Sequence, residues 1–586
     1  MEIRLWILLP VALAACGLWA GCGPDHYHRS ADNEVYGILK QRSAEVFGKT
    51  NETFTINTTY SNRKPTDIPP PEIIQQRLLT PKRRLTLSDA VKAAIALSPN
   101  YQTQKETVFS TALALTAQRH TFAPVWASTS RAVFTRNSAG RDDVVVQNNL
   151  SVTQTLKSGG QVAISTVNDY INYFSTFPPG ASSSVPNYNG APPHNSAAFV
   201  ANFAQPLLRN AGYKIATENL TQAERNVIYG LRTFARFEQT FAVSIVTSYF
   251  RLLQQRDVIR NDYSTYQNLK RVRERSEALG MDRMAAFQVN QVRLQELSAM
   301  STYISDAQSY QNSLDNFKIL LGLPVGTDIT LDESALEELR KMNLPAVELT
   351  QDQGHRVAVQ HRLDLQNTID QFEDSKRKID VAIDQLRANL NLIGSAALPQ
   401  AQGYDYSRFD IRQYQAYGGV QVDLPLDRLN ERNSFRTSQI NFEQQLRTLQ
   451  TQLDTIRNNI QVDLRALEAA RKNFIIQQRA VRLAQSNVDG AVLLMEAARI
   501  DMLNLLNAQS TLLSAQNTFE QALVDYNVAR WNLLSDLGII RVDLDRFWVV
   551  EQPIPLPGAP KSPAIRAKVA PLPTEIELIP PDLLFQ

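Results

Sequence analysis

The chain has 586 residues, a formal net charge of +2, 43% hydrophobic residues and 20% charged residues. This length allows several domains, and the near-neutral charge gives no reason to expect nucleic acid as a partner. Both cysteines, Cys16 and Cys22, lie near the N-terminus. The rest of the chain therefore offers no disulfide and no thiolate metal site.

The first residues have the pattern of a secretion signal. Arg4 precedes a short apolar core over 5–13, and small residues with a cysteine follow. Both Leu-Ala-Ala-Cys16 and Trp-Ala-Gly-Cys22 resemble the lipoprotein box, in which the cysteine is acylated and becomes the first mature residue. Cys16 has the better box, but the apolar stretch ends at Cys22, so we favour a signal peptide over 1–21. The glycine after either cysteine implies sorting to the outer membrane; ordinary cleavage without a lipid is the alternative.

The next segment, 22–84, is polar and contains several prolines, and we interpret it as an extended N-terminal arm. A short helix is predicted over 87–97, with Ser88 as its cap and Pro99 beyond its end. A second helix is predicted to end near Thr121.

From Pro124 the apolar pattern changes to a period of two, which is typical of strands. Clear alternation covers Val125–Phe134, and shorter stretches repeat it until Ala204. A polar loop rich in proline, glycine and serine interrupts the pattern over 175–196. We therefore expect strands over about 124–206.

A helical pattern then returns. One long helix is predicted from about Ile215 to Ala278, and Gly280 lies in the break after it. A second arm runs to Leu321, which makes a long hairpin over 215–321. Together these elements form a predicted first repeat over 85–331.

The second half of the chain follows the same plan. A helix is predicted from about Asp364 to Leu390, with strands over about 389–424 and a hairpin over 432–537. The predicted second repeat covers 345–545. A proline-rich tail over 551–586 completes the chain.

The second hairpin carries the clearest pattern, because its apolar residues recur every seven positions. The two runs contain Leu446, Leu453, Ile460, Leu467, Phe474, Val481 and Val488, then Leu505, Leu512, Phe519, Tyr526 and Leu533. This period favours supercoiled packing between helices. The first arm would be roughly 98 Å long at ~1.5 Å per residue, which suits a rod, fibre or tube.

A few strands in one chain leave unsatisfied edges, which lipid forbids. One chain offers four clear strands, and the candidates at 144–173 either widen the sheet or fold back against it. We therefore expect several copies to close one barrel. Aromatic residues near the strands suit membrane girdles, although ordinary sheet packing explains them equally well.

Several motifs in register resemble the TolC-type outer-membrane efflux family over about 85–545. They are Leu503–Gln509, Asp525-Tyr526-Asn527, Leu537-Gly538, Arg362–Leu365, and the strand-to-helix junctions at 205–212 and 424–433. The resemblance implies a mainly helical protein with a membrane β-barrel. In that family three copies share one barrel, and their helical hairpins form a periplasmic α-barrel.

The resemblance implies a passive outer-membrane duct of a tripartite efflux or type I secretion system. Its partners would be two more copies of the chain, a periplasmic adaptor, an inner-membrane transporter and outer-membrane lipid. Neither a cofactor nor catalysis is implied, and no catalytic motif stands out. A lipid-anchored periplasmic coiled coil without a pore is the alternative.

Geometry places the periplasmic tip at the two helix–helix turns. The candidate gating residues are Gly280, Asp282, Arg283, Ala498, Arg499 and Asp501. Arg499 and Asp501 are candidates for ion pairs that close the tip, although simple exposure to solvent explains them as well. Ala498 replaces the family's usual glycine.

Many relatives narrow the tip with acidic residues just after the second turn. The matching positions here are Asn504 and Asn507. Rings of amides carry no fixed charge, which predicts weaker cation selectivity than in relatives with acidic rings. The alternative is that both side chains face a neighbouring helix.

Overall fold

The computed structural model describes residues 23–47, 54–61, 63–78, 82–136, 142–173, 194–280, 286–341, 344, 347, 349–399, 409, 411–497, 499–500 and 502–540. The chain forms two compact units. The first comprises Met1–Thr55, Thr107–Leu231 and Ile369–Thr448, and the second Ile56–Glu106, Arg232–Thr368 and Leu449–Gln586. Four helices contribute residues to both units: α5 (Pro99–His120), α7 (Glu218–Gly280), α11 (Leu363–Gln385) and α12 (Leu429–Glu496).

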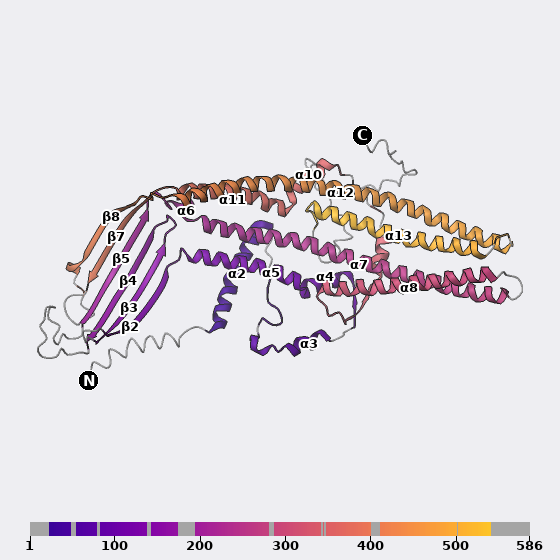
Figure 1. The fold of residues 1–586 in the computed structure, drawn as a ribbon, viewed down its shortest axis with the longest axis horizontal. Helices are drawn as coiled ribbons and strands as arrows, with labels where there is room; N and C mark the ends of the chain where they lie inside the picture. The colour runs from indigo at the N-terminus through magenta and orange to yellow at the C-terminus, as the bar shows by residue number, and fades with distance from the viewer. Residues whose placement is uncertain are drawn as a thin grey trace. The chain divides into compact units, whose positions relative to one another are not determined.

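The first unit contains a six-stranded sheet in the order β2-β3-β4-β5-β7-β8 (Figure 1). Its strands are β2 (Val125–Arg136), β3 (Asp142–Thr155), β4 (Gln161–Tyr173), β5 (His194–Pro206), β7 (Asn389–Pro399) and β8 (Gln415–Asp423). Every neighbouring pair is antiparallel. The segment 144–173, whose role the sequence left open, belongs to this sheet as β3 and β4.

The predicted extended arm over 22–84 is wrong for its first part, because Pro24–Phe47 form helix α2. Val35 is fully buried, and the ring of Tyr36 meets the Phe109 ring of α5 with centroids 5.5 Å apart. Arg42 pairs with Glu224 of α7 at 3.2 Å. The apolar residues of α2 are few and widely spaced, so only packing on α5 and α7 makes this helix recognisable.

A tight junction joins β5 to α7 through α6 (Tyr213–Ala216). Asn210 and Gly212 both have positive φ, 61° and 91°. The backbone N–H of Asn210 donates to Asp384 Oδ2 of α11 at 2.6 Å. The turn between β3 and β4 packs on this junction, since the Gly212 N–H donates to the Ser158 carbonyl at 3.1 Å. A Cβ on Gly159 would lie 2.3 Å from the Asn210 carbonyl oxygen, so the site requires glycine.

The second unit contains shorter elements around the long helices. They are a 3₁₀ turn η1 (Pro65–Asp67), α3 (Pro70–Leu78), β1 (Lys82–Leu85), α4 (Leu87–Leu97), α8 (Ala286–Leu321), β6 (Asp328–Leu331), α9 (Ser334–Lys341), α10 (Gln351–His361) and α13 (Met502–Asp536). Strands β1 and β6 pair in parallel. The hydroxyl of the buried Tyr249 donates to the Leu85 carbonyl at 2.9 Å and accepts from the Asp332 N–H at 3.0 Å, which fixes this pair on α7.

Several predicted boundaries need correction. The cap of α4 is Thr86, whose hydroxyl accepts from the Asp89 N–H, rather than Ser88. Helix α11 ends at Gln385 instead of Leu390, because β7 begins at Asn389. A helix cannot continue where its residues enter a strand ladder.

The two predicted helical hairpins are present as α7 with α8 and α12 with α13 (Figure 1). The seven-residue seam of α12 packs on that of α13: Ile460, Leu467, Tyr526 and Leu533 share one buried cluster. Phe474 and Phe519 lie in contact, with ring centroids 5.0 Å apart. A partner for the seam is therefore found within the chain.

Among the described residues, no helix combines the length and the apolar character needed to cross a membrane.

Candidate functional site

The six-stranded sheet has one apolar and one polar face. The strand register places Trp126, Val152, Ile164, Ala201 and Ala396 side by side in one row. The next row on the same face contains Leu150, Thr166, Phe199 and Leu398. On the other side of the first row, toward the helical end of the sheet, the same face contains Phe203, Leu392, Val420 and Val422. Alternation along each strand thus builds an apolar band, which is bordered on the same face by Ser130 and Asn148.

This apolar face is exposed to solvent rather than packed on a core. Trp126 is 71% exposed, Ile164 54% and Val420 60%. A contiguous apolar surface of this kind is unfavourable in water and marks a contact with lipid or protein.

The opposite face carries many polar side chains, interspersed with small apolar ones such as Ala163, Val167 and Val200. Its rows contain Thr129, Gln147, Asn149, Ser151, Thr153, Gln161, Ser165, Asn202, Asn391, Ser395 and Gln421. Such side chains suit contact with water. The sheet therefore has the alternation of a wall between an apolar and an aqueous phase.

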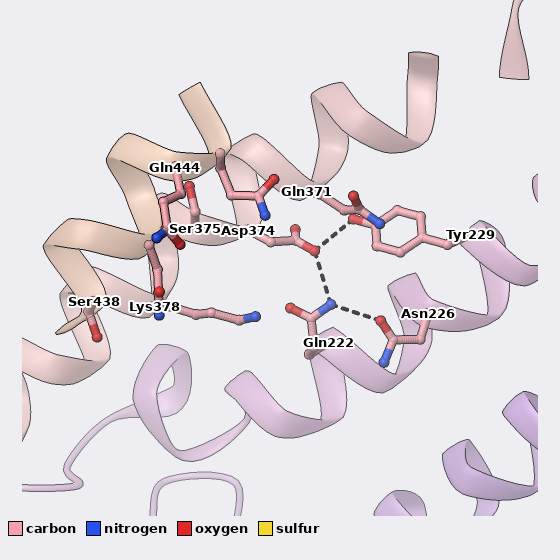
Figure 2. Close-up of a pocket in the computed structure, with 11 residues that line it drawn as sticks. Gln222, Asn226, Tyr229, Gln371, Asp374, Ser375, Lys378, Ser438 and Gln444 are labelled. Atoms are coloured by element: carbon pink, nitrogen blue, oxygen red, sulfur yellow. Dashed lines mark hydrogen bonds between the residues drawn. The ribbon is translucent and has the colours of Figure 1, made fainter. Parts of the chain in front are cut away.

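A polar cavity of about 440 Å³ lies in the first unit, between α7, α11 and α12. Figure 2 shows its lining, which includes Gln222, Asn226, Tyr229, Gln371, Asp374, Ser375, Lys378, Ser438 and Gln444. The buried Asp374 accepts hydrogen bonds from Tyr229 at 2.7 Å and from Gln222 at 3.0 Å. Burial raises the pKa of Asp374, but these bonds and the charges of Arg377 and Arg225 outweigh it, and the net pKa lies below the usual value. The Asp374 carboxylate thus ties α11 to α7 through its hydrogen bonds.

The predicted tip residues are only partly within the described chain. Gly280 is the last residue of α7, and Arg499 is exposed, with its N–H donating to the Leu494 carbonyl at 2.9 Å. Asp282, Arg283, Ala498 and Asp501 lie outside the described residues, as do Cys16 and Cys22. Their predicted roles stay predictions.

The two candidate constriction residues lie on the first turns of α13. Asn504 and Asn507 are exposed, whereas Leu505 and Leu506 between them are buried. Leu506 packs against Leu269 of α7 and Val292 of α8. Both amides therefore point away from the apolar contacts of the hairpins, and their place in a pore stays a prediction.

Two pairs of carboxyl groups in the second unit escaped the sequence analysis. Burial raises the pKa of Asp262 to about 6, and the neighbouring Asp306 of α8 adds to the rise. Burial likewise raises the pKa of Asp463 to about 7, with a further contribution from Asp536. The residues of each pair are more than forty positions apart, so no local motif could have revealed them. Among the described residues, no cluster of histidine, cysteine or carboxylate groups is arranged to hold a metal.

Comparison with known proteins identifies solved structures with a similar architecture. No protein-family model matches the chain, and neither does any curated protein. Among solved structures, the CmeC outer membrane channel of Campylobacter jejuni is 12% identical with a TM-score of 0.58, over 77% of this chain and 85% of CmeC. The outer membrane protein VceC of Vibrio cholerae is 14% identical with a TM-score of 0.55, over 77% and 96% of the two chains. The open-state MtrE outer membrane channel of Neisseria gonorrhoeae is 11% identical with a TM-score of 0.55, over 77% and 89%.

The chain has the fold of the outer-membrane channels. The resemblance to the TolC-type family that the sequence motifs indicated is thereby confirmed at the level of the fold. The mainly helical character is confirmed as well. Within this fold, the junction motifs at 205–212 and 424–433 lie where the sheet passes into α7 and α12.

Proposed function

We propose that the protein is a passive channel of the outer membrane, the duct component of a tripartite efflux or type I secretion system. The observation that carries this proposal is the sheet, whose exposed face is apolar and whose other face is polar. Such a sheet suits a position between lipid and a water-filled lumen.

Strand length supports a membrane-spanning role. Strands β2, β3, β4 and β5 contain 12, 14, 13 and 13 residues. A tilted strand needs ~9–11 residues to cross the hydrocarbon core. The edges β2 and β8 need partners in lipid, because unpaired backbone groups there cost several kcal/mol each. Closure with two further copies, as a homotrimer, satisfies both edges.

In this proposed channel the long helices form a tube in the periplasm. Each of the two predicted repeats contributes an equivalent hairpin to that tube. A periplasmic adaptor and an inner-membrane transporter engage its tip, where the turns act as a gate. Acylation of Cys22, or alternatively Cys16, anchors the chain in the outer membrane. The function requires no cofactor and no catalytic step.

The test uses full-length protein purified in detergent and added to planar bilayers. We expect trimers that conduct ions. Ile164→Arg on the apolar face should reduce membrane insertion, since a charge on the lipid face costs ~2–4 kcal/mol at mid-membrane. Ser165→Arg, one residue further on the polar face, is the matched control and should insert normally.

The alternative of a lipid-anchored coiled coil without a pore predicts the opposite outcome. Monomers that fail to conduct, or equal insertion of both arginine variants, would overturn the proposal. The apolar sheet face disfavours this alternative, because a periplasmic rod has no use for it.

A further inference from the structure

The width of the channel follows from the number of strands in each chain. All six strands belong to one continuous sheet, and the central strands β3, β4, β5 and β7 are paired on both sides. The β3–β4 hairpin is also fixed at its turn, where the Ser158 hydroxyl donates to Gln205 Oε1 at 2.9 Å and the Ser158 carbonyl accepts from Gly212. It is therefore part of the wall rather than an appendage on it.

The two edges suit a second copy of the same sheet. Because the sheet has an even number of antiparallel strands, β2 and β8 run in opposite directions. A head-to-tail copy therefore continues the antiparallel order across the seam. The same pairing places the apolar face of one sheet beside the apolar face of the next, since Trp126 of β2 and Val420 of β8 lie on the same apolar side.

We propose that the barrel contains eighteen strands, and that it admits hydrated solutes about 20 Å across. This rests on the trimer of the proposed function: three six-stranded sheets give eighteen strands. With strands ~4.8 Å apart and tilted by ~40°, the backbone diameter is about 36 Å and the space inside the side chains about 25 Å. Barrels of this strand number hold an aqueous channel.

The chemistry of the polar face defines the class of solute. Its polar side chains in the central strands are mostly neutral hydroxyls and amides, such as Ser151, Ser165, Asn202 and Ser395, and small apolar residues lie between them. A wide lumen of this composition discriminates little by charge. The barrel therefore passes bulky polar solutes, and selection is left to other parts of the duct.

The test measures barrel width independently of any gate at the tip. Asn202→Cys places a thiol on the polar face, and Ala201→Cys places one on the apolar face as the matched control. Trimers in lipid vesicles, selected for outward-facing barrels, are treated from the barrel side with a small maleimide and with a polymer-linked maleimide ~20 Å across, chosen against the expected lumen of about 25 Å. Both reagents should label Asn202→Cys to the same extent, and neither should label Ala201→Cys above the unsubstituted protein.

A deletion of residues 142–173 should narrow the barrel by a defined number of strands. It removes β3 and β4 and leaves β2 antiparallel to β5, so that three copies form twelve strands with a lumen of about 13 Å. In this background the large probe should no longer label Asn202→Cys, while the small probe still does. If the deletion variant fails to assemble, the strand number is counted in a cryo-electron-microscopy reconstruction of the unaltered trimer.

The outcomes separate the two proposals. A conducting trimer whose Asn202→Cys reacts with the small probe only, or whose barrel shows fewer than eighteen strands, overturns the wide barrel and leaves the channel function intact. A protein that forms no trimer and conducts no ions overturns the channel function itself.

Discussion

The two helical hairpins share one architecture but carry their charged contacts at different places along their length. Near its turn the first hairpin, α7 with α8, relies on charged groups: Arg273 pairs with Glu296 at 2.5 Å and with Glu277 at 2.9 Å. Farther along, the carboxyl groups of Asp262 and Asp306 lie side by side, and this contact adds to the raised pKa of Asp262. The second hairpin, α12 with α13, has the ring contact of Phe474 with Phe519 along its seam, and its own carboxyl pair, Asp463 and Asp536, includes the last residue of α13.

This difference teaches that equal length and topology do not imply equal sensitivity to conditions. Ion pairs weaken with salt, and buried carboxyl groups respond to pH. Apolar contacts respond to neither to first order. We therefore expect high salt to loosen the ion pairs near the turn of the first hairpin but not the Phe474–Phe519 contact of the second, whereas both hairpins contain a carboxyl pair that responds to pH.

The largest effect is expected from Phe519→Ala in the second hairpin. Removing the partly buried ring that contacts Phe474 should lower stability by ~2 kcal/mol, since its apolar burial and its ring contact are both lost. Leu483→Ala on α12 is the control, because Leu483 is 67% exposed and should lose little. Hydrogen exchange of α12 and α13 measures both variants. Equal protection of α12 and α13 in the two variants would contradict the assignment of the apolar seam as the main contact between these helices.

A smaller, pH-dependent effect is expected from Asp262→Asn in the first hairpin. The folded state raises the pKa of Asp262 from 3.8 to about 6, so it binds the proton more tightly than the unfolded chain. Stability from this group is present below about pH 4 and is lost as the pH rises through 6. At pH 8 the variant should therefore be more stable than the parent by ~1–2 kcal/mol, with little gain at pH 4.

Thermal unfolding followed by circular dichroism at both pH values checks this prediction. Asp489→Asn on α12 is the matched control, since Asp489 is exposed. A variant whose gain is the same at pH 4 and pH 8 would show that Asp262 is not held protonated by its surroundings.

Arg273→Gln should have a still smaller effect, confined to low ionic strength. The pKa of Glu277 is lowered by its hydrogen bond from Arg273, and both side chains are partly exposed to water. Salt at about 1 M screens such pairs almost completely. Hydrogen exchange near the end of α7 should thus be faster than in the parent at low salt and the same at high salt. A difference that persists at high salt would point to lost packing instead.

Asn504→Asp combined with Asn507→Asp should leave stability nearly unchanged, because both side chains are exposed. If these residues line the constriction, the new rings of carboxylates should make the channel cation-selective and sensitive to block by trivalent cations. Single-channel recording in planar bilayers measures this. Identical block in the parent and the variant would place both residues outside the conducting path.

The sequence predicted the elements that depend on local periodicity. The seven-residue apolar repeat of α12 and α13 indicated that these helices pair, and Ile460 and Leu533 both lie in the resulting core. Alternation indicated strands at Val125–Phe134. It did not reveal α2, whose contacts with Phe109 and Glu224 come from distant parts of the chain. Nor did it reveal Asp374 as a tie between α7 and α11, since its partners lie about 150 residues away.

The sequence alone determined which residues form long helices, which form amphipathic strands, and which family the motifs resemble, because these properties repeat over a few neighbouring positions. Only the tertiary structure decided that 144–173 joins the sheet, that all six strands share one apolar face, and that Asp262 and Asp306 lie together. Strand order and the contacts between distant side chains depend on which backbone segments pair by hydrogen bonds. No local sequence pattern encodes that pairing.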